Sequence, residues 1–211
     1  MTPRERVYAG LLISSYVFGA VMLGHDVVPG FVYLTAFHLC FSAVLLMTAH
    51  RPWVDAWPWV WLILCGALGW GAEYVGVHGE WLFGEYAYGD VLGPKWRAIP
   101  LVLAVNWILV VYTVCATVAA WTPRWSTVAK VVTCALVMVA LDVLIEPVAI
   151  ALDLWTWRAG EPPLQNYLGW LVVGLAQAAL FFALLPFSEN RLAPLVLLLQ
   201  VGFFGYLTLV L

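Results

Sequence analysis

Charged side chains are scarce in this sequence, which has only 9 Lys and Arg and 12 Asp and Glu among 211 residues. They make up 10% of the chain, against about 25% in an average soluble domain. So few charges cannot cover the surface of a protein of this size in water. This shortage, with a net charge of only −3, excludes an ordinary cytosolic enzyme, a nucleic-acid binder and a disordered chain.

Motifs that bind metals or cofactors are also missing from the sequence. It contains no HExxH, no clustered His and Asp residues, and no glycine-rich nucleotide-binding loop. The four cysteines, Cys40, Cys65, Cys115 and Cys134, lie singly within apolar runs, without CxxC spacing. Such cysteines behave as small apolar side chains rather than as a disulfide frame or a zinc site. We therefore expect neither a metal nor a cofactor.

Apolar residues are abundant instead, at 64% of the chain. A helix that spans a bilayer needs about 20 mainly apolar residues, and most of the candidate runs are separated by proline or glycine. The sequence predicts an all-α, polytopic membrane protein with one domain over residues 1–211. The first run has no signal-peptidase pattern, so we expect it to remain as a helix. The predicted helices are seven: 5–24, 29–49, 57–78, 99–121, 127–151, 166–187 and 191–211.

The basic residues favour one orientation in the cell membrane. With the N-terminus in the cytoplasm, six of the nine Lys and Arg residues lie at inner helix ends and three lie on the outer side. Cytoplasmic loops are usually the more basic ones, so we predict a cytoplasmic N-terminus. The two long connections, residues 79–98 and 152–165, then share the outer side. Their aromatic and acidic composition is typical of functional loops rather than of disorder.

Carboxylates interrupt the apolar runs at Glu73, Asp142 and Glu146. Ionisable residues inside a bilayer are costly, which makes them candidates for function. A rise of about 1.5 Å per residue puts Glu73, Asp142 and Asn106 at one level, ~21 Å above the inner surface. Asp142 and Glu146 share a helical face because they are four residues apart. One of two such neighbours can keep its proton and act as a general acid. Alternatively, the pair joins helices through hydrogen bonds.

Aromatic residues are the second signal, with 13 Trp, 9 Tyr and 10 Phe. Tryptophan is common at membrane interfaces, and one group is expected to serve as anchors there: Trp53, Trp57, Trp59, Trp61, Trp121 and Trp125. A second group is expected near the acidic level: Trp70, Trp107, Trp155, Trp157 and Trp170. Electron-rich rings beside a proton donor can stabilise a carbocation, by the attraction that underlies cation–π contacts.

Two blocks of sequence carry a resemblance to a known family. The first runs from Glu73 to Pro100 and includes Gly76-Val77, Phe83-Gly84-Glu85-Tyr86-Ala87-Tyr88 and Leu92-Gly93-Pro94-Lys95. The second includes Asp142, Glu146-Pro147, Trp155-Thr156-Trp157 and the stretch from Pro163 through Asn166-Tyr167 to Gly169-Trp170. In order and spacing, these motifs resemble the carotenoid biosynthesis membrane proteins of bacteria and archaea, the hydratases of the bisanhydrobacterioruberin and γ-carotene type. The chain departs from the family pattern at His78-Gly79 and Asn106-Trp107.

The resemblance implies an enzyme that hydrates a terminal isoprenoid double bond of an acyclic carotenoid without a cofactor. A carboxylic acid would protonate the alkene, and a second carboxylate would activate water. Glu73, Asp142 and Glu146 are the predicted catalytic residues, with Asp142 or Glu146 as the acid and Glu73 as the partner that orients water. The predicted substrate contacts are Trp70, His78, Phe83, Tyr86, Tyr88, Asn106, Trp107, Trp155, Trp157, Asn166 and Trp170. The expected partners are a carotenoid or other polyisoprenoid and membrane lipid, and no nucleic acid.

Other functions remain open at the level of sequence. A lycopene cyclase-like enzyme or a carotenoid isomerase would begin with the same protonation. A non-catalytic seven-helix binding or transport protein is a further alternative, but a retinal pigment is disfavoured because the last helix lacks a lysine. In the first long connection, Lys95 and Arg97 are expected to pair with Glu85 or Asp90 and fix the loop.

Overall fold

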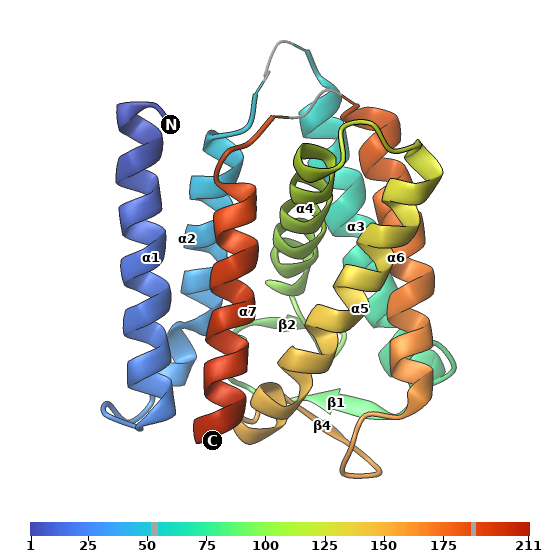
Figure 1. Cartoon of the computed structure of the whole chain (residues 1–211). Helices are drawn as coiled ribbons and strands as arrows, with labels where there is room; N and C mark the ends of the chain where they lie inside the picture. The colour runs from blue at the N-terminus through green and yellow to red at the C-terminus, as the bar shows by residue number, and fades with distance from the viewer. Residues whose placement is uncertain (52–54, 187–188) are drawn as a thin grey trace.

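The computed structural model describes residues 1–51, 55–186 and 189–211, which form a bundle of helices (Figure 1). In this part of the chain, seven helical segments are long and apolar enough to cross a membrane. This confirms the predicted all-α fold with seven spans. The helices are α1 Pro3–Gly24, α2 Thr35–Thr48, α3 Trp57–Gly79, α4 Leu103–Trp121, α5 Thr127–Ala151, α6 Leu164–Leu184 and α7 Ala193–Val210.

The second span differs from the single helix predicted over 29–49. It opens with a 3-10 helix, η1 Phe31–Leu34, before α2 begins at Thr35. Gly30, directly before η1, has φ +79°, a conformation that glycine adopts without steric cost. The short 3-10 turn and α2 together form one span, Phe31–Thr48.

The predicted ends of the fourth and sixth spans also shift. α4 starts at Leu103 rather than at 99, because Ile99–Pro100 form a short strand, β3. α6 ends at Leu184, and its predicted end at 187 lies outside the described residues. Trp53, predicted to be an interface anchor, lies outside them as well.

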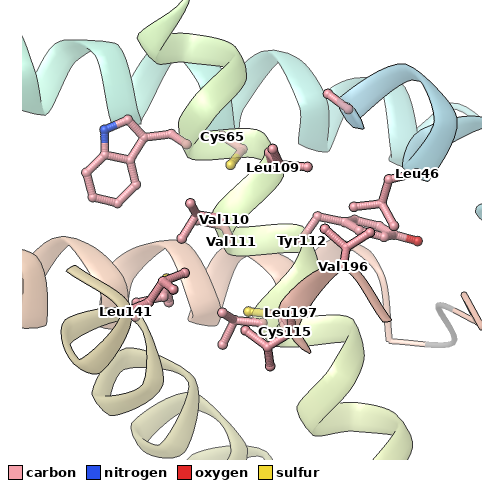
Figure 2. Packing of buried hydrophobic residues seen from close by; sticks show 14 of the residues in the cluster. Leu46, Cys65, Leu109, Val110, Val111, Tyr112, Cys115, Leu141, Val196 and Leu197 are labelled. Carbon is pink, nitrogen blue, oxygen red and sulfur yellow. The ribbon is translucent and has the colours of Figure 1, made fainter. Parts of the chain in front are cut away.

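Helix α4 lies in the middle of the bundle, and its side chains form the centre of the core. It packs against α2, α3, α5, α6 and α7. Figure 2 shows this packing, with Leu109, Val110 and Tyr112 of α4 pointing toward neighbouring helices. The prediction of Trp61 as an interface anchor is wrong, because Trp61 is fully buried, with its ring 5.7 Å from that of Tyr112. Four of the predicted anchors are more than half exposed: Trp57, Trp59, Trp121 and Trp125.

The two long connections form a small β ribbon that sequence analysis did not predict. β1 Tyr86–Tyr88, from the first connection, pairs antiparallel with β4 Trp155–Trp157, from the second. The ribbon closes the end of the bundle opposite the N-terminus (Figure 1). Gly89 permits this approach, since a Cβ atom there would lie 2.1 Å from the carbonyl oxygen of Asp153. The connections are therefore one structure, although more than 60 residues separate β1 from β4 in the sequence.

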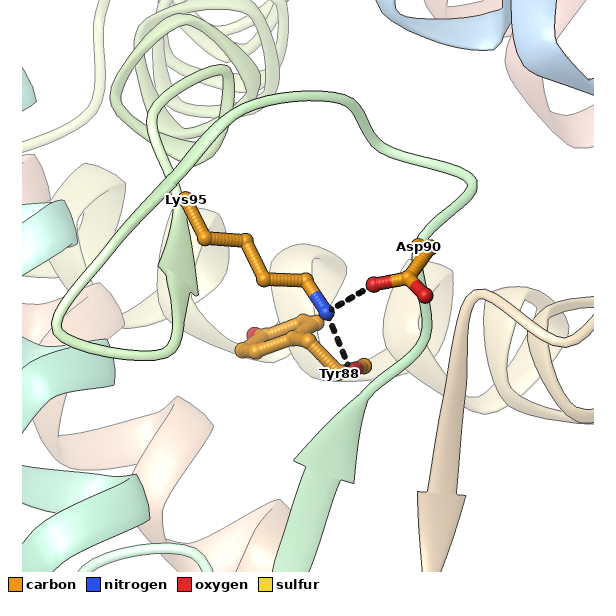
Figure 3. A network of polar contacts seen from close by, with 3 residues as sticks. All are labelled: Tyr88, Asp90 and Lys95. Carbon is orange, nitrogen blue, oxygen red and sulfur yellow. Dashed lines mark hydrogen bonds and ion pairs between the residues drawn. The ribbon is translucent and has the colours of Figure 1, made fainter.

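Ion pairs fix the ribbon in place. Lys95 Nζ lies 2.7 Å from Asp90 Oδ1 and donates a hydrogen bond to the carbonyl oxygen of Tyr88 at 2.9 Å (Figure 3). The hydrogen bond from Lys95 lowers the pKa of Asp90. The predicted pairing of Lys95 is confirmed, whereas Glu85 pairs with Arg158 of the other connection rather than with Arg97. This second ion pair joins the two connections to each other.

Beside the ribbon, β2 Lys95–Trp96 and β3 Ile99–Pro100 form a two-residue hairpin. Its turn residues Arg97 and Ala98 have φ +50° and +68°. Positive φ at both turn residues is the geometry that matches the twist of two antiparallel strands. The hairpin holds Trp96 against Trp70 of α3, with ring centroids 5.0 Å apart.

Glycines on α3 let bulky side chains approach that helix closely. A Cβ atom at Gly69 would lie 2.3 Å from Trp107 Cγ, and one at Gly76 would lie 2.5 Å from Phe83 Cδ2. Both aromatic side chains reach the polar end of the bundle described below. The small residues therefore determine where the aromatic rings lie.

We predict that Gly69→Ala destabilises the protein by about 1–3 kcal/mol, the usual cost of overpacking a core. Gly71→Ala is the matched control, because it lies on the same helix and a Cβ atom there would meet no atom within 4 Å. The control should leave stability unchanged or raise it by up to ~1 kcal/mol through helix propensity. The free energy of unfolding can be measured by titrating sodium dodecyl sulfate into mixed micelles. Equal stability of the two variants would contradict the close packing of Trp107.

Candidate functional site

The β ribbon directs four aromatic side chains toward the helices. In its register, Tyr86 pairs with Trp157 and Tyr88 pairs with Trp155, while Ala87 opposite Thr156 is exposed. Successive side chains of a strand point to opposite faces, so the Tyr-x-Tyr and Trp-x-Trp motifs each place both rings on one face. The paired rings touch, with centroids 5.0 Å apart for Tyr86 and Trp157 and 6.0 Å for Tyr88 and Trp155.

Glu73 of α3 accepts three hydrogen bonds beneath the ribbon. The hydroxyl groups of Tyr86 and Tyr88 each donate to Oε2 at 2.6 Å, and Trp107 Nε1 donates to Oε1 at 2.9 Å. Oxygen–oxygen distances of 2.5–2.7 Å are typical of a hydroxyl group that bonds to an ionised carboxylate. The hydrogen bonds that Glu73 accepts from the two tyrosines are therefore those expected for an ionised carboxylate.

The two tyrosines remain donors because they do not ionise readily. Burial, and next the neighbouring Glu73 carboxylate, raise the pKa of Tyr86 and Tyr88 well above the ordinary value of a phenol. A tyrosinate beside a carboxylate would place two negative charges together in an apolar environment. Both hydroxyl groups thus keep their protons and direct them at Glu73.

Glu146 of α5 has a separate set of donors. Its Oε2 accepts from Trp157 Nε1 at 2.8 Å and from Trp155 Nε1 at 3.0 Å. Its Oε1 accepts from Asn166 Nδ2 at 3.2 Å. All three donors are N–H groups, whose bonds to oxygen are ordinarily longer than those of hydroxyl groups. The indole donors come from β4, so one ribbon serves carboxylates on two different helices.

Asp142 lies one helical turn below Glu146 and is only 1% exposed. Asn166 Nδ2 donates to its Oδ2 at 2.7 Å and so bridges the two acidic residues. The other oxygen, Oδ1, is buried without a hydrogen-bond partner. An ionised carboxylate with one unsatisfied oxygen is strongly disfavoured in an apolar environment, so this geometry suits a protonated Asp142.

The carboxylates of Glu73 and Glu146 face a common cavity of about 30 Å³. Asn106, Asn166 and Leu103 line it as well. A single water molecule needs about 10–15 Å³ of such space and two to four polar partners, so the cavity has room for one or two waters. Aromatic residues form the rest of the wall: Phe83, Tyr86, Tyr88, Trp155, Trp157 and Trp170.

A second, larger cavity of about 280 Å³ lies beside the first. The two share Leu103, Asn106 and Trp155 as lining residues. The larger cavity is almost entirely apolar and lies among α1, η1, α2, α4, α5 and α7. Sequence reasoning missed it, because its wall combines residues from helices far apart in the chain.

The structure brings most of the predicted site residues together. Ten of them line the small cavity: Glu73, Phe83, Tyr86, Tyr88, Asn106, Glu146, Trp155, Trp157, Asn166 and Trp170. Trp107 and Asp142 lie behind this wall and contact it through Glu73 and Asn166, respectively. The ring of Trp107 also stacks on that of Trp170, with centroids 4.5 Å apart.

Two predicted substrate contacts lie elsewhere. His78 is exposed, with its ring stacked on Tyr74 and Nδ1 3.0 Å from the Tyr74 carbonyl oxygen. Trp70 stacks on Trp96 and Tyr74, and it lines neither cavity. His78 comes five residues after Glu73 and so lies about 140° around α3 from it. Trp70, three residues before Glu73, instead stacks on Trp96 of the hairpin.

Among the described residues, no three His, Cys, Asp or Glu side chains are placed to hold a metal ion. The expectation of a site without metal or cofactor stays a prediction. The described polar groups instead offer one carboxyl group bonded by two tyrosine hydroxyls, a second bonded by two indole N–H groups, and a third with a bare oxygen. Such an arrangement can accept a proton at one point and donate one at another, with space for water between.

Comparison with known proteins identifies related sequences. A family described as "Carotenoid biosynthesis protein" matches residues 30–210. A curated relative from Haloarcula japonica, named bisanhydrobacterioruberin hydratase, is 33% identical over 149 residues, which is 64% of this chain and 48% of the relative. The chain thus spans about half the length of this relative. No solved structure matches the chain significantly.

We predict that Tyr88→Phe destabilises the protein by about 1.5–3 kcal/mol, the usual contribution of a hydrogen bond to a charged group. The loss should be smaller in a Glu73→Gln background, because the acceptor is then neutral. A double-mutant cycle of unfolding free energies measures this coupling. Tyr74→Phe is a control on the outer face of α3 and should change stability little. Equal losses from Tyr88→Phe in both backgrounds would contradict the charged hydrogen bond.

Proposed function

The chain belongs to the family of carotenoid biosynthesis proteins, and we propose that it is a membrane enzyme that adds water to a terminal isoprenoid double bond of an acyclic carotenoid. It would act as a hydro-lyase by acid–base catalysis, without a cofactor. The name of the Haloarcula japonica relative supports hydration. The observation that carries the proposal is the pair of carboxylates, Glu73 and Glu146, that face one water-sized cavity among aromatic rings.

The reaction needs one proton donor and one proton acceptor. A carboxylic acid transfers its proton to the less substituted alkene carbon and leaves a tertiary carbocation on the other. The oxygen of a water molecule then bonds to the cation, and a carboxylate takes the proton that this water loses. The sum is the addition of one water molecule across the double bond. The addition involves no net oxidation or reduction, so no redox partner is needed. The protons balance because one carboxyl group loses a proton and the other gains one.

The hydrogen bonds and the shared cavity support an assignment of these roles. Glu73 would be the acceptor that orients and deprotonates water, because its two bonds from tyrosine hydroxyls, at 2.6 Å, are of the kind made to a charged carboxylate. Glu146 would be the acid, because it faces the same cavity and the charge of one carboxylate disfavours ionisation of a second one nearby. Asp142 would be a positioning residue, connected to Glu146 through Asn166.

The aromatic wall supports a cationic intermediate. Trp155 and Trp157 donate their indole N–H groups to Glu146, so their rings border the place where the acid acts. The π-face of an aromatic ring attracts a positive charge within about 6 Å of its centroid. Rings that surround the cavity also keep bulk water away, so that only a bound water reaches the cation.

The same features bear on location and on partners. We place the enzyme in the cell membrane with a cytoplasmic N-terminus, supported by the charge bias of six basic residues against three. The site then lies near the outer side, since the ribbon closes the end of the bundle opposite the N-terminus (Figure 1). A carotenoid would reach it from the surrounding lipid.

Expression in bacteria that accumulate lycopene or γ-carotene tests the proposal. Wild-type protein should yield a pigment heavier by one water molecule, detected by chromatography and mass spectrometry. Glu146→Gln and Glu73→Gln should each lower product formation by about 10²–10⁴-fold, the usual contribution of general acid–base catalysis. Glu161→Gln is the matched control, because Glu161 is exposed in the turn after β4, and it should retain activity.

Reaction in deuterated water tests whether an exchangeable acid protonates the alkene carbon. Protonation of carbon by the enzyme's acid should leave one carbon-bound deuterium in the hydrated product. A product of unchanged mass but shifted absorption would mean that an internal double bond captures the cation, as in cyclisation, or that the alkene isomerises. No product from folded protein in the membrane would refute the enzymatic proposal and leave binding or transport.

A further inference from the structure

Asn106 is a polar side chain at the site to which the proposed chemistry gives no role. It lies on α4, one turn after Leu103, and lines the small cavity together with Glu73 and Glu146. Its amide group makes no hydrogen bond to any other described residue. The residue is half-buried and its amide atoms are accessible, unlike the unpartnered polar atoms that are fully buried elsewhere in the bundle. Amides inside proteins nearly always have a partner, so Asn106 indicates a polar molecule in the cavity.

The other hydrogen-bond donors that reach the two carboxylates are already in use. Asn166 Nδ2 carries two hydrogens and donates to Asp142 and to Glu146. The hydroxyl groups of the two ribbon tyrosines donate to Glu73, and the indole N–H groups of the two ribbon tryptophans donate to Glu146. Asn106 therefore differs from these residues, because its amide is still able to bind a molecule in the cavity.

Glu73 also has room for one more hydrogen bond. An ionised carboxylate has about four lone-pair sites, and Glu73 uses two on Oε2 and one on Oε1. A water molecule that donates one hydrogen to Glu73 Oε1 needs an acceptor for its second hydrogen. The amide oxygen of Asn106 can supply that acceptor. The lone pairs of the water oxygen then remain free to attack carbon.

We propose that Asn106 and Glu73 together hold the nucleophilic water, and that Asn106 determines whether the carbocation gains water or loses a proton. The inference rests on the proposed function for the reaction, and it adds a residue that selects the product. In the first outcome, a C–O bond forms and Glu73 takes a proton from the water. In the second, a C–H bond next to the cationic carbon breaks, its electron pair forms an alkene again, and the proton returns to the carboxylate of Glu146.

The position of Asn106 suits this role. It belongs to the walls of both cavities, so it lies where the polar cavity borders the apolar one. The next residue of α4, Trp107, donates its indole N–H group to Glu73 Oε1. One turn of α4 therefore positions both the carboxylate and the water that it deprotonates. The chain departs from the family pattern at Asn106, so the inference concerns a residue of this chain in particular.

Asn106→Leu tests the proposal, because leucine has a similar shape and no amide. Membranes that contain the whole protein are supplied with lycopene or γ-carotene in deuterated water. Hydrated product should fall about 10²-fold, the usual cost of misplacing a reacting group. The recovered carotenoid should nevertheless gain carbon-bound deuterium, because Glu146 still protonates the alkene and the cation then loses a proton. Mass spectrometry detects this exchange as a mass increase without addition of water.

Thr117→Val is the matched control on the same helix, since it also replaces a polar side chain by an apolar one of similar shape. Thr117 is buried, donates to the carbonyl oxygen of Thr113 and lines neither cavity. This variant should hydrate as the wild type does. Asn106→Ala removes the same amide without adding volume and should give the same products as Asn106→Leu, so the test does not depend on one variant being folded.

The outcomes separate this inference from the proposed function. Wild-type hydration by Asn106→Leu and Asn106→Ala would overturn the role of Asn106 and leave the proposed function intact. Loss of both hydration and deuterium exchange in the folded variants would also overturn it, because protonation of the alkene would then depend on Asn106. Absence of hydrated product from the wild-type protein would instead refute the proposed function itself, and this inference with it.

Discussion

The burial of carboxylates in an apolar bundle is the constraint on which the rest of this structure depends. Glu73, Asp142 and Glu146 are each at most 6% exposed, and a buried carboxyl group is tolerated only with hydrogen bonds or a bound proton. The helices that carry them supply none of the donors. Donors come instead from α4, α6 and the two strands of the ribbon. Closure of the bundle end is thus an electrostatic requirement as well as a packing one.

The ribbon meets this requirement through its two-residue period. Tyr86 and Tyr88 reach Glu73, while Trp155 and Trp157 reach Glu146, because paired strands present both motifs on one face. The ion pair of Glu85 with Arg158 joins the connections on their exposed side. Glycines make room for the rings, most clearly at Gly76, where a Cβ atom would lie 2.7 Å from the Tyr86 hydroxyl oxygen. The strand pairing, the ion pair and the glycines therefore all help to hold the aromatic donors against the two carboxylates.

The polar end and the apolar cavity meet at a boundary. Asn106 and Trp155 lie in the walls of both cavities, so an apolar molecule in one would have its end beside the carboxylates of the other. In the proposed reaction, this boundary separates the isoprenoid chain from the single water that attacks it.

The sequence alone determined the number of helices long and apolar enough to cross a membrane, since this depends on local hydropathy. It also marked most residues of the site through the Tyr-x-Tyr, Trp-x-Trp and acidic motifs. Only the tertiary structure decided how Trp61 is buried, why Trp70 and His78 face away, and which carboxylate receives which donors. The ribbon and the larger cavity also exist only in the tertiary structure. These features depend on which surfaces meet across the bundle, and contacts between segments distant in sequence leave no periodic signal in either segment.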